Sequence, residues 1–180
     1  EDLMRHEQAC GKLREVAVGI SQSVFYPLEL PQMIEEQFMM ILEKAEAIDD
    51  PFEGAFFTLV HLPYLQPFED VNKRTARLAA NIPMVQKNLC PISFVDVDKG
   101  IYTAAMLGVY ELNRTELLRD LFVWTYKRSC QRYHALRGAQ GNPDPFQMQF
   151  SDELKDCVRE VVLAKLTAEQ AAERITAYAK

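Results

Sequence analysis

The chain has 180 residues, of which 48% are hydrophobic, values typical of one globular domain with a substantial core. Its formal net charge of −6 at pH 7 gives no global attraction to nucleic acid or anionic lipid. The four cysteines share no spacing typical of a metal site, and no apolar run approaches membrane-spanning length. We therefore expect a cytoplasmic protein with reduced thiols and with neither nucleic-acid nor membrane partners.

Residues 14–30 predict a β-hairpin in a chain that otherwise reads as helical. Apolar residues recur at every second position on both sides of a Ser-Gln-Ser turn: Val16, Val18, Ile20, Val24, Tyr26 and Leu28. Two strands alone are marginally stable, so such a hairpin either covers the core or presents an edge to a partner peptide. The sequence leaves both readings open.

Two helices are expected between the hairpin and residue 66. Pro31 begins the first, whose apolar residues follow a core-facing stripe. The second begins after Asp50, is strongly apolar, and is expected to bend or end at Pro63. His61 lies five residues before Gln66, which corresponds to about 500° of helical rotation. We interpret His61 as a structural histidine and not as a displaced catalytic base.

Residues 66–77 read Gln-Pro-Phe-Glu-Asp-Val-Asn-Lys-Arg-Thr-Ala-Arg, a loop that enters a helix. Asp70 or Asn72 is expected to cap that helix. Arg74 and Arg77 lie on one face near its start, where free N–H groups and the helix dipole favour an anion. Two guanidiniums suit a polyphosphate, and Asp70 then suits a Mg²⁺ ion that bridges phosphate oxygens. The alternative is a capped, solvated helix start with an Arg–Asp ion pair.

This segment resembles the signature of the Fic/Doc family, H-P-F-x-[D/E]-G-N-[G/K]-R-x-x-R. Seven residues match it in register: Pro67, Phe68, Asp70, Asn72, Lys73, Arg74 and Arg77. The resemblance implies a mainly α, Fic-type helical bundle with one small β-hairpin, the flap, which aligns a segment of a target protein by strand addition. It also implies that ATP or another nucleotide binds with Mg²⁺, and that a nucleotidyl (AMP) or phosphoryl group is transferred to a protein hydroxyl.

The same resemblance assigns roles to single residues. Asp70 would hold the Mg²⁺ ion, and Phe68 would anchor the loop in the core. Asn72 and Arg74 would bind the nucleotide phosphates, and Arg77 would bind phosphate or brace the loop. Lys73 would also be a nucleotide-binding residue. Tyr110 and Asn113, near the start of a late helix, are the candidates for residues that flank the adenine.

Two residues depart from the signature. Gln66 stands where the family has its catalytic His, and a primary amide cannot accept a proton near neutral pH; losing a general base costs about 10²–10⁴ in rate. Val71 replaces a Gly, and a β-branched residue resists positive φ, so the turn must be altered or strained. Three functions stay open: a transferase with impaired base chemistry, an inactive pseudoenzyme that senses nucleotide or binds peptide, and a helical scaffold with a relict motif.

The remaining residues predict further helices. A capping-box pattern at 113–116 opens the longest of them. We expect a Fic-like core over 1–137, a loop rich in Gly and Pro over 138–150, and C-terminal helices over 151–180 that lead into a missing region. No inhibitory-helix pattern, [S/T]-x-x-x-E-[G/N], occurs in either terminal region. Because the sequence begins with Glu1 and not Met, we interpret it as a fragment of a longer protein.

Overall fold

The computed structural model describes the backbone of residues 9–140 and, beyond them, residues 156, 159–161, 163, 164, 167 and 170–172. Its contacts divide the chain into two units, Glu1–Tyr133 and His134–Lys180. Of the predicted loop at 138–150, residues 138–140 still belong to the last long helix, and the rest lies outside the described residues. Most of the predicted C-terminal helical region also lies outside them.

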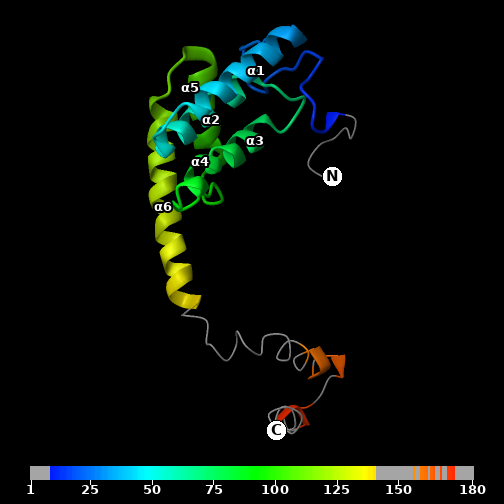
Figure 1. Ribbon diagram of the computed structural model, residues 1–180, viewed down its shortest axis with the longest axis vertical. Coiled ribbons are helices and arrows are strands. Elements are labelled where there is room, and N and C mark those ends of the chain that lie inside the picture. The colour runs from blue at the N-terminus through cyan, green and yellow to red at the C-terminus, as the bar shows by residue number, and fades with distance from the viewer. Residues whose placement is uncertain are drawn as a thin grey trace. The chain divides into compact units, whose positions relative to one another are not determined.

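Residues 9–140 contain six α-helices, which confirms the mainly α prediction (Figure 1). Their bounds are α1 Pro31–Glu46, α2 Pro51–Leu65, α3 Asn72–Ala79, α4 Asn81–Gln86, α5 Lys99–Leu112 and α6 Glu116–Gln140. Local signals explain two of the starts. Asp50 caps α2 by accepting the N–H groups of Phe52 and Glu53, and Asp98 caps α5 by accepting that of Ile101. None of the helices in the described part of the chain combines the length and apolarity needed to cross a membrane.

Helix α2 is the centre of the bundle. It packs against α1, α3, α4 and α5, and most of its residues are buried. The core around it includes Leu59 of α2, Met84 of α4, Met106 of α5 and Leu118 of α6, all fully buried. Burying one such side chain contributes about 1.5–3 kcal/mol. The end of α2, where the segment 66–77 begins, is therefore fixed by packing on several sides.

Residues 14–30 turn where the sequence predicts, but the flap hairpin is not confirmed. Gln22 has a φ of 68°, and the Ser23 N–H donates to the Ile20 carbonyl at 3.1 Å. Within residues 9–140 the structure assigns no strand, so the two arms of this segment do not form a ladder.

Three residues of the second arm have no free N–H to donate to such a ladder. The Val24 N–H donates to the Glu111 carboxylate at 3.2 Å, and the Phe25 N–H donates to Ser23 Oγ at 3.2 Å. Pro27 has no N–H to donate. The alternating apolar pattern therefore describes an extended arm that lies over the core and is not paired to a second strand.

Candidate functional site

The segment 66–71 turns the chain from α2 into α3 through two left-handed residues. Gln66 ends α2 with a φ of 51°, and its N–H donates to the Leu62 carbonyl at 3.1 Å. Val71 precedes α3 with a φ of 62° and a ψ of 9°. The sequence predicts that Val71 leaves this turn either altered or strained. The structure shows the strained alternative, because Val71 keeps the left-handed conformation. A β-branched residue in this region stores strain of about 1–3 kcal/mol.

Neither residue expected to cap α3 does so, and that prediction was wrong. The N-cap position belongs to Val71, and no side chain bonds to the first-turn N–H groups there. Asn72 is instead the first residue of the helix, and its buried side chain folds back into the loop. Asp70 Oδ1 accepts the adjacent N–H of Val71 at 2.6 Å. The start of α3 thus keeps the open N–H groups that favour an anion.

Asn72 closes the loop with both ends of its amide. Its Oδ1 accepts the Phe68 N–H at 2.9 Å, while its Nδ2 donates to the Phe68 carbonyl at 2.8 Å and to Gln66 Oε1 at 2.9 Å. The Phe68 ring contacts Phe38 of α1, with ring centres 5.9 Å apart. A contact between Asn72 and a phosphate would have to replace one of these bonds.

Gln66 is held inside the same network. Its Nε2 donates to the Pro63 carbonyl at 2.6 Å and lies 3.5 Å from the hydroxyl of Tyr110, which comes from α5. Its Oε1 accepts from Asn72, so both ends of the amide have partners. Burial raises the pKa of Tyr110 well above its ordinary value, which keeps the phenol neutral. This cluster can orient a hydroxyl, but it holds no group ready to accept a proton at neutral pH.

Arg74 and Arg77 line one cavity of about 390 Å³ between α3 and the segment 92–95. Val71 lines it as well, so the cavity begins at the strained turn. The Arg77 guanidinium lies over the rings of Tyr102 and Phe94, at 5.4 and 5.8 Å from their centres. Such cation–π contacts fix the guanidinium without neutralising it. The structure therefore brings two of the predicted phosphate-binding residues to one hollow.

Asp70 lies beside this cavity and not in its lining. Its Oδ2 is 4.0 Å from Arg74 Nη2, and both side chains are about half exposed. This is the Arg–Asp pair of the alternative interpretation, and an exposed pair contributes about 0–1 kcal/mol. The carboxylate is accessible to an ion. Among the described residues there is no group of three His, Cys, Asp or Glu side chains that could hold a metal by themselves.

The other three predicted site residues have different surroundings. The half-buried Lys73 has its ammonium 5.9 Å from the ring centre of the buried Tyr110, and burial, followed by the charge of Arg77, lowers the pKa of Lys73. Asn113 is exposed at the C-terminal end of α5, where it has a φ of 51°. It does not open the next helix as predicted, because α6 begins at Glu116. The structure thus brings Lys73 and Tyr110 together, and it places Asn113 at the end of α5, three residues after Tyr110.

The sequence did not predict that Arg14 supports the loop at Gln66. It is 1% exposed, and its Nε donates to the Gln66 carbonyl at 2.5 Å. Its terminal nitrogens donate to the carbonyls of Val16, at 2.9 Å, and Leu28. Burial lowers its pKa, which the nearby Glu29 carboxylate partly offsets. All of its hydrogen-bond partners are backbone carbonyls, so no residue type or spacing signals them in advance.

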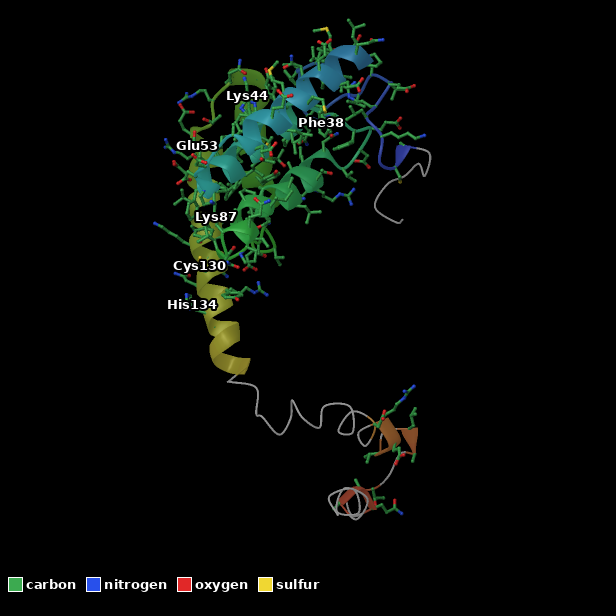
Figure 2. The ribbon with its side chains drawn as sticks, in the orientation of Figure 1. Phe38, Lys44, Glu53, Lys87, Cys130 and His134 are labelled. Atoms are coloured by element: carbon green, nitrogen blue, oxygen red, sulfur yellow. The ribbon has the colours of Figure 1, made fainter. Side chains whose placement is uncertain are left out.

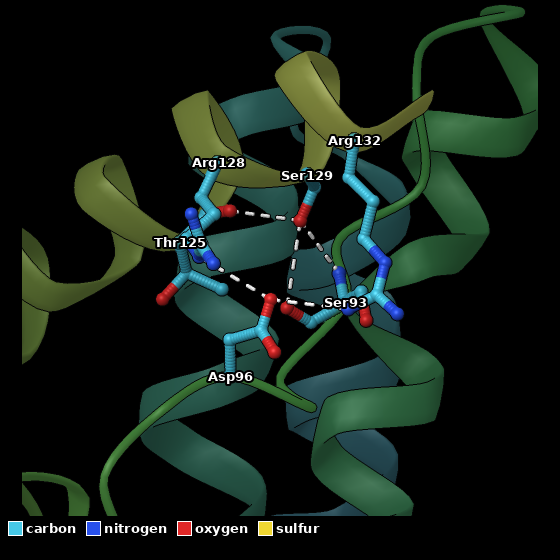
Figure 3. Close-up of polar contacts among 6 residues, drawn as sticks. All are labelled: Ser93, Asp96, Thr125, Arg128, Ser129 and Arg132. Carbon is cyan, nitrogen blue, oxygen red and sulfur yellow. Dashed lines mark hydrogen bonds and ion pairs between the residues drawn. The ribbon is translucent and has the colours of Figure 1, made fainter. Parts of the chain in front are cut away.

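The segment 90–97 forms the far wall of the cavity and is attached to α6 (Figure 3). The Ser93 N–H donates to Ser129 Oγ at 2.9 Å, and Ser129 Oγ donates to the Thr125 carbonyl at 2.7 Å. One carboxylate on the same segment pairs with two arginines of α6: Asp96, with Arg128 at 3.2 Å and Arg132 at 3.1 Å. The wall is therefore held by the longest helix of the core.

Residues 1–84 match the model of the Fic/DOC family. This range contains the whole segment 66–77 and ends inside α4, so α5 and α6 lie beyond it. Comparison with curated proteins finds no match.

Proposed function

Because residues 1–84 match the model of the Fic/DOC family, we propose that residues 66–77 bind ATP or another nucleotide together with Mg²⁺. The observation that carries this proposal is the cavity of about 390 Å³ lined by Arg74 and Arg77. Its volume lies in the range of small-molecule sites. It begins at Val71, directly before the uncapped start of α3.

The phosphates would lie between the first turn of α3 and the two arginines. Arg74 would donate from the exposed side of the cavity, and Arg77 from the side held by Phe94 and Tyr102. Each charge-assisted hydrogen bond of this kind contributes about 1.5–3 kcal/mol. Lys73, one residue before Arg74, would add a third cation. Asn72 would contribute indirectly, because its amide hydrogen bonds to the Phe68 backbone hold the loop in place.

Asp70 fits the role of the metal ligand. Mg²⁺ usually takes one or two carboxylates, with phosphate oxygens and water completing its shell, and it would offset phosphate charge here. Asp70 offers one half-exposed carboxylate whose Oδ1 is oriented by the N–H of Val71. Tyr110, which contacts Gln66 and Lys73, and the exposed Asn113, at the end of the same helix, are the candidates for residues that flank the nucleotide base.

The bonds of Gln66 favour a regulatory module that binds nucleotide without rapid turnover. Its amide has partners at both ends, and an amide in that position accepts no proton. The second candidate is slow transfer of an AMP or phosphoryl group to the hydroxyl of a target protein, docked on the extended segment 14–30. The retained turn at Val71 favours it, because such transfers depend strongly on positioning and on charge stabilisation.

Calorimetric titration with ATP tests the proposal. We expect heat of binding in the presence of Mg²⁺ and a weaker interaction when the ion is removed with a chelator. Asp70→Asn should abolish that difference while it keeps the metal-independent binding. Labelled ATP and a mixture of candidate proteins then separate the two functions, because only the transferase leaves label on protein. Absence of binding with and without Mg²⁺ would refute both.

A further inference from the structure

Two half-buried cysteines meet where the cavity wall, residues 90–97, joins α6. Cys90 begins this wall, and Cys130 lies on α6 (Figure 2). Their thiols share a hydrogen bond, although the two residues are far apart in the sequence. Neither cysteine lines the arginine cavity. The pair is therefore a separate feature of the structure, placed behind the wall and not inside the candidate nucleotide site.

Further contacts hold the same wall against the same helix (Figure 3). The Ser93 N–H donates at 2.9 Å to the hydroxyl of Ser129, the residue before Cys130. Three residues farther along the wall, Asp96 pairs with Arg128 at 3.2 Å. The contact between the thiols thus belongs to a series of contacts that runs from residue 90 to residue 96. Their number fixes which part of α6 the first cysteine meets.

Two thiols in contact either bind a metal or form a disulfide. Among the described residues no third His, Cys, Asp or Glu joins this pair to complete a metal-binding group. Tyr126 lies one helical turn before Cys130, and burial, followed by a hydrogen bond with Cys130, raises the pKa of Tyr126 to about 12. The phenol is therefore neutral at pH 7 and is a poor metal ligand. The chemistry that the pair supports is a disulfide.

The local backbone lets the two sulfur atoms approach. They must come within about 2.05 Å of each other in a disulfide. Cys90 lies in the connection between α4 and α5, outside any helix, so its backbone is not fixed by a helical ladder. Its sulfur lies 3.5 Å from the Pro91 carbonyl, and rotation toward Cys130 gives up only this weak S–H···O bond. Both side chains are half-buried, which leaves them open to a small oxidant.

We propose that Cys90 and Cys130 form a reversible disulfide that attaches the cavity wall covalently to α6 when the protein meets a peroxide or oxidised glutathione. Disulfides of this transient kind are the ones found in reducing compartments. The attachment bears on the arginine cavity, because Phe94 of the same wall lies against the Arg77 guanidinium. An effect on nucleotide binding rests on the proposed function, whereas the disulfide and the fixed wall do not.

The order of attack follows from the state of Cys90. Burial and the hydrogen bond with Cys130 raise the pKa of Cys90 to about 11, so Cys90 is a thiol at pH 7 and the Cys130 thiolate attacks first. Its sulfur takes one oxygen of hydrogen peroxide, the O–O bond breaks and hydroxide leaves, which gives a sulfenic acid. Cys90 then attacks that sulfur, the S–O bond breaks, and the Cys90 proton leaves with the hydroxide as water. Two thiols are oxidised and one peroxide is reduced to two waters.

A reducing thiol reverses the reaction. Its thiolate attacks one sulfur of the disulfide and forms a mixed disulfide, and a second thiol then releases the protein cysteine. Oxidised glutathione makes the bond by the same exchange in the other direction: Cys130 takes one glutathione and releases the other, and Cys90 displaces the first. No metal or cofactor is needed for either direction.

Peptide mapping tests whether the bond forms. The protein is treated with hydrogen peroxide or oxidised glutathione, alkylated in denaturant and digested with trypsin, which leaves Cys90 in peptide 88–99 and Cys130 in peptide 129–132. We expect these peptides to be joined, with a mass two hydrogens below their sum, and to separate in dithiothreitol. Cys10→Ser is the control, because Cys10 is exposed and should not affect the yield. Unlinked peptides, or equal linkage of Cys10 to either cysteine, overturn the proposal.

Hydrogen exchange tests whether the bond fixes the wall. The N–H groups of Ile92 and Ser93 donate to Asn81 and Ser129, so their exchange requires the wall to open. We expect both to exchange about tenfold more slowly in the oxidised protein than in the reduced one. Cys130→Ser treated with the same oxidant should show no such slowing. Linked cysteines with unchanged exchange at both positions overturn the proposed attachment.

Neither measurement contains nucleotide, so the two proposals fail separately. Titration of the same protein with Mg²⁺–ATP completes the comparison. Linked cysteines and slowed exchange in a protein that binds no ATP would refute the nucleotide function and leave the disulfide standing. ATP binding in a protein whose two peptides stay unlinked would do the reverse.

Discussion

Replacing Val71 by Gly should stabilise the protein, although it removes a side chain. Val71 has a φ of 62°, a region in which a β-branched residue is strained by about 1–3 kcal/mol. Gly relieves that strain but adds about 0.5–1 kcal/mol of backbone entropy to the unfolded chain. The side chain is only half-buried at the cavity wall, so little packing is lost. We expect a net gain of about 1 kcal/mol in the free energy of unfolding.

Urea denaturation of matched variants measures this gain. Val71→Asn should also stabilise the protein, because Asn tolerates the left-handed region, whereas Val71→Ala should gain less. Val95→Gly is the control, since Val95 is exposed and has no positive φ. It should lose about 0.5–1 kcal/mol. If Val71→Gly destabilises the protein as much as the control does, the strain assigned to this turn is absent and the reasoning is refuted.

Three further predictions concern the loop and its supports. Gln66→His should raise transfer of label from ATP to protein by roughly 10²-fold or more if the missing base limits transfer. If neither the single variant nor the double variant Gln66→His/Val71→Gly transfers label, the transferase candidate is excluded. Arg14→Met should lower the free energy of unfolding by about 2–5 kcal/mol, because several buried carbonyls lose their donor; a loss below about 0.5 kcal/mol in urea would contradict that role. Burial and the contact with Cys130 raise the pKa of Cys90 from 9.0 to about 11, so its alkylation by iodoacetamide at pH 8 should be about 100-fold slower than that of an unshifted thiol and should accelerate up to pH 11. Mass spectrometry that finds Cys90 modified as fast as the exposed Cys10 would refute that shift.

The helices and the region of the candidate site could be predicted from the sequence because their signals are local. Pro31, Asp50 and Asp98 mark the starts of α1, α2 and α5, and apolar periodicity gives the faces that pack. The charged and amide residues of the segment 66–77 predicted that a helix begins in this segment and that two arginines lie near its start. Both kinds of signal act over one or two helical turns.

Contacts between distant residues could not be predicted in this way. Arg14 and Gln66 are 52 positions apart, and the bond joins a side chain to a backbone carbonyl. The attachment of the cavity wall to α6 joins Ser93 to Ser129 across 36 positions. Alternation over 14–30 predicted two strands, but it could not show that Glu111 accepts the N–H group that a ladder would need. Such pairings depend on tertiary packing, which local pattern does not specify.

The measurement that tests the central claim most directly is the affinity for Mg²⁺–ATP of Arg74→Ala against that of Arg119→Ala. Arg119 is an exposed arginine of α6 that pairs with its neighbour Asp120, so it controls for the loss of one positive charge. We predict that Arg74→Ala weakens binding by about 1.5–3 kcal/mol, or about 10- to 150-fold, while Arg119→Ala changes it by less than about twofold. Equal affinities in the two variants would contradict the account and place any nucleotide site outside the cavity at α3.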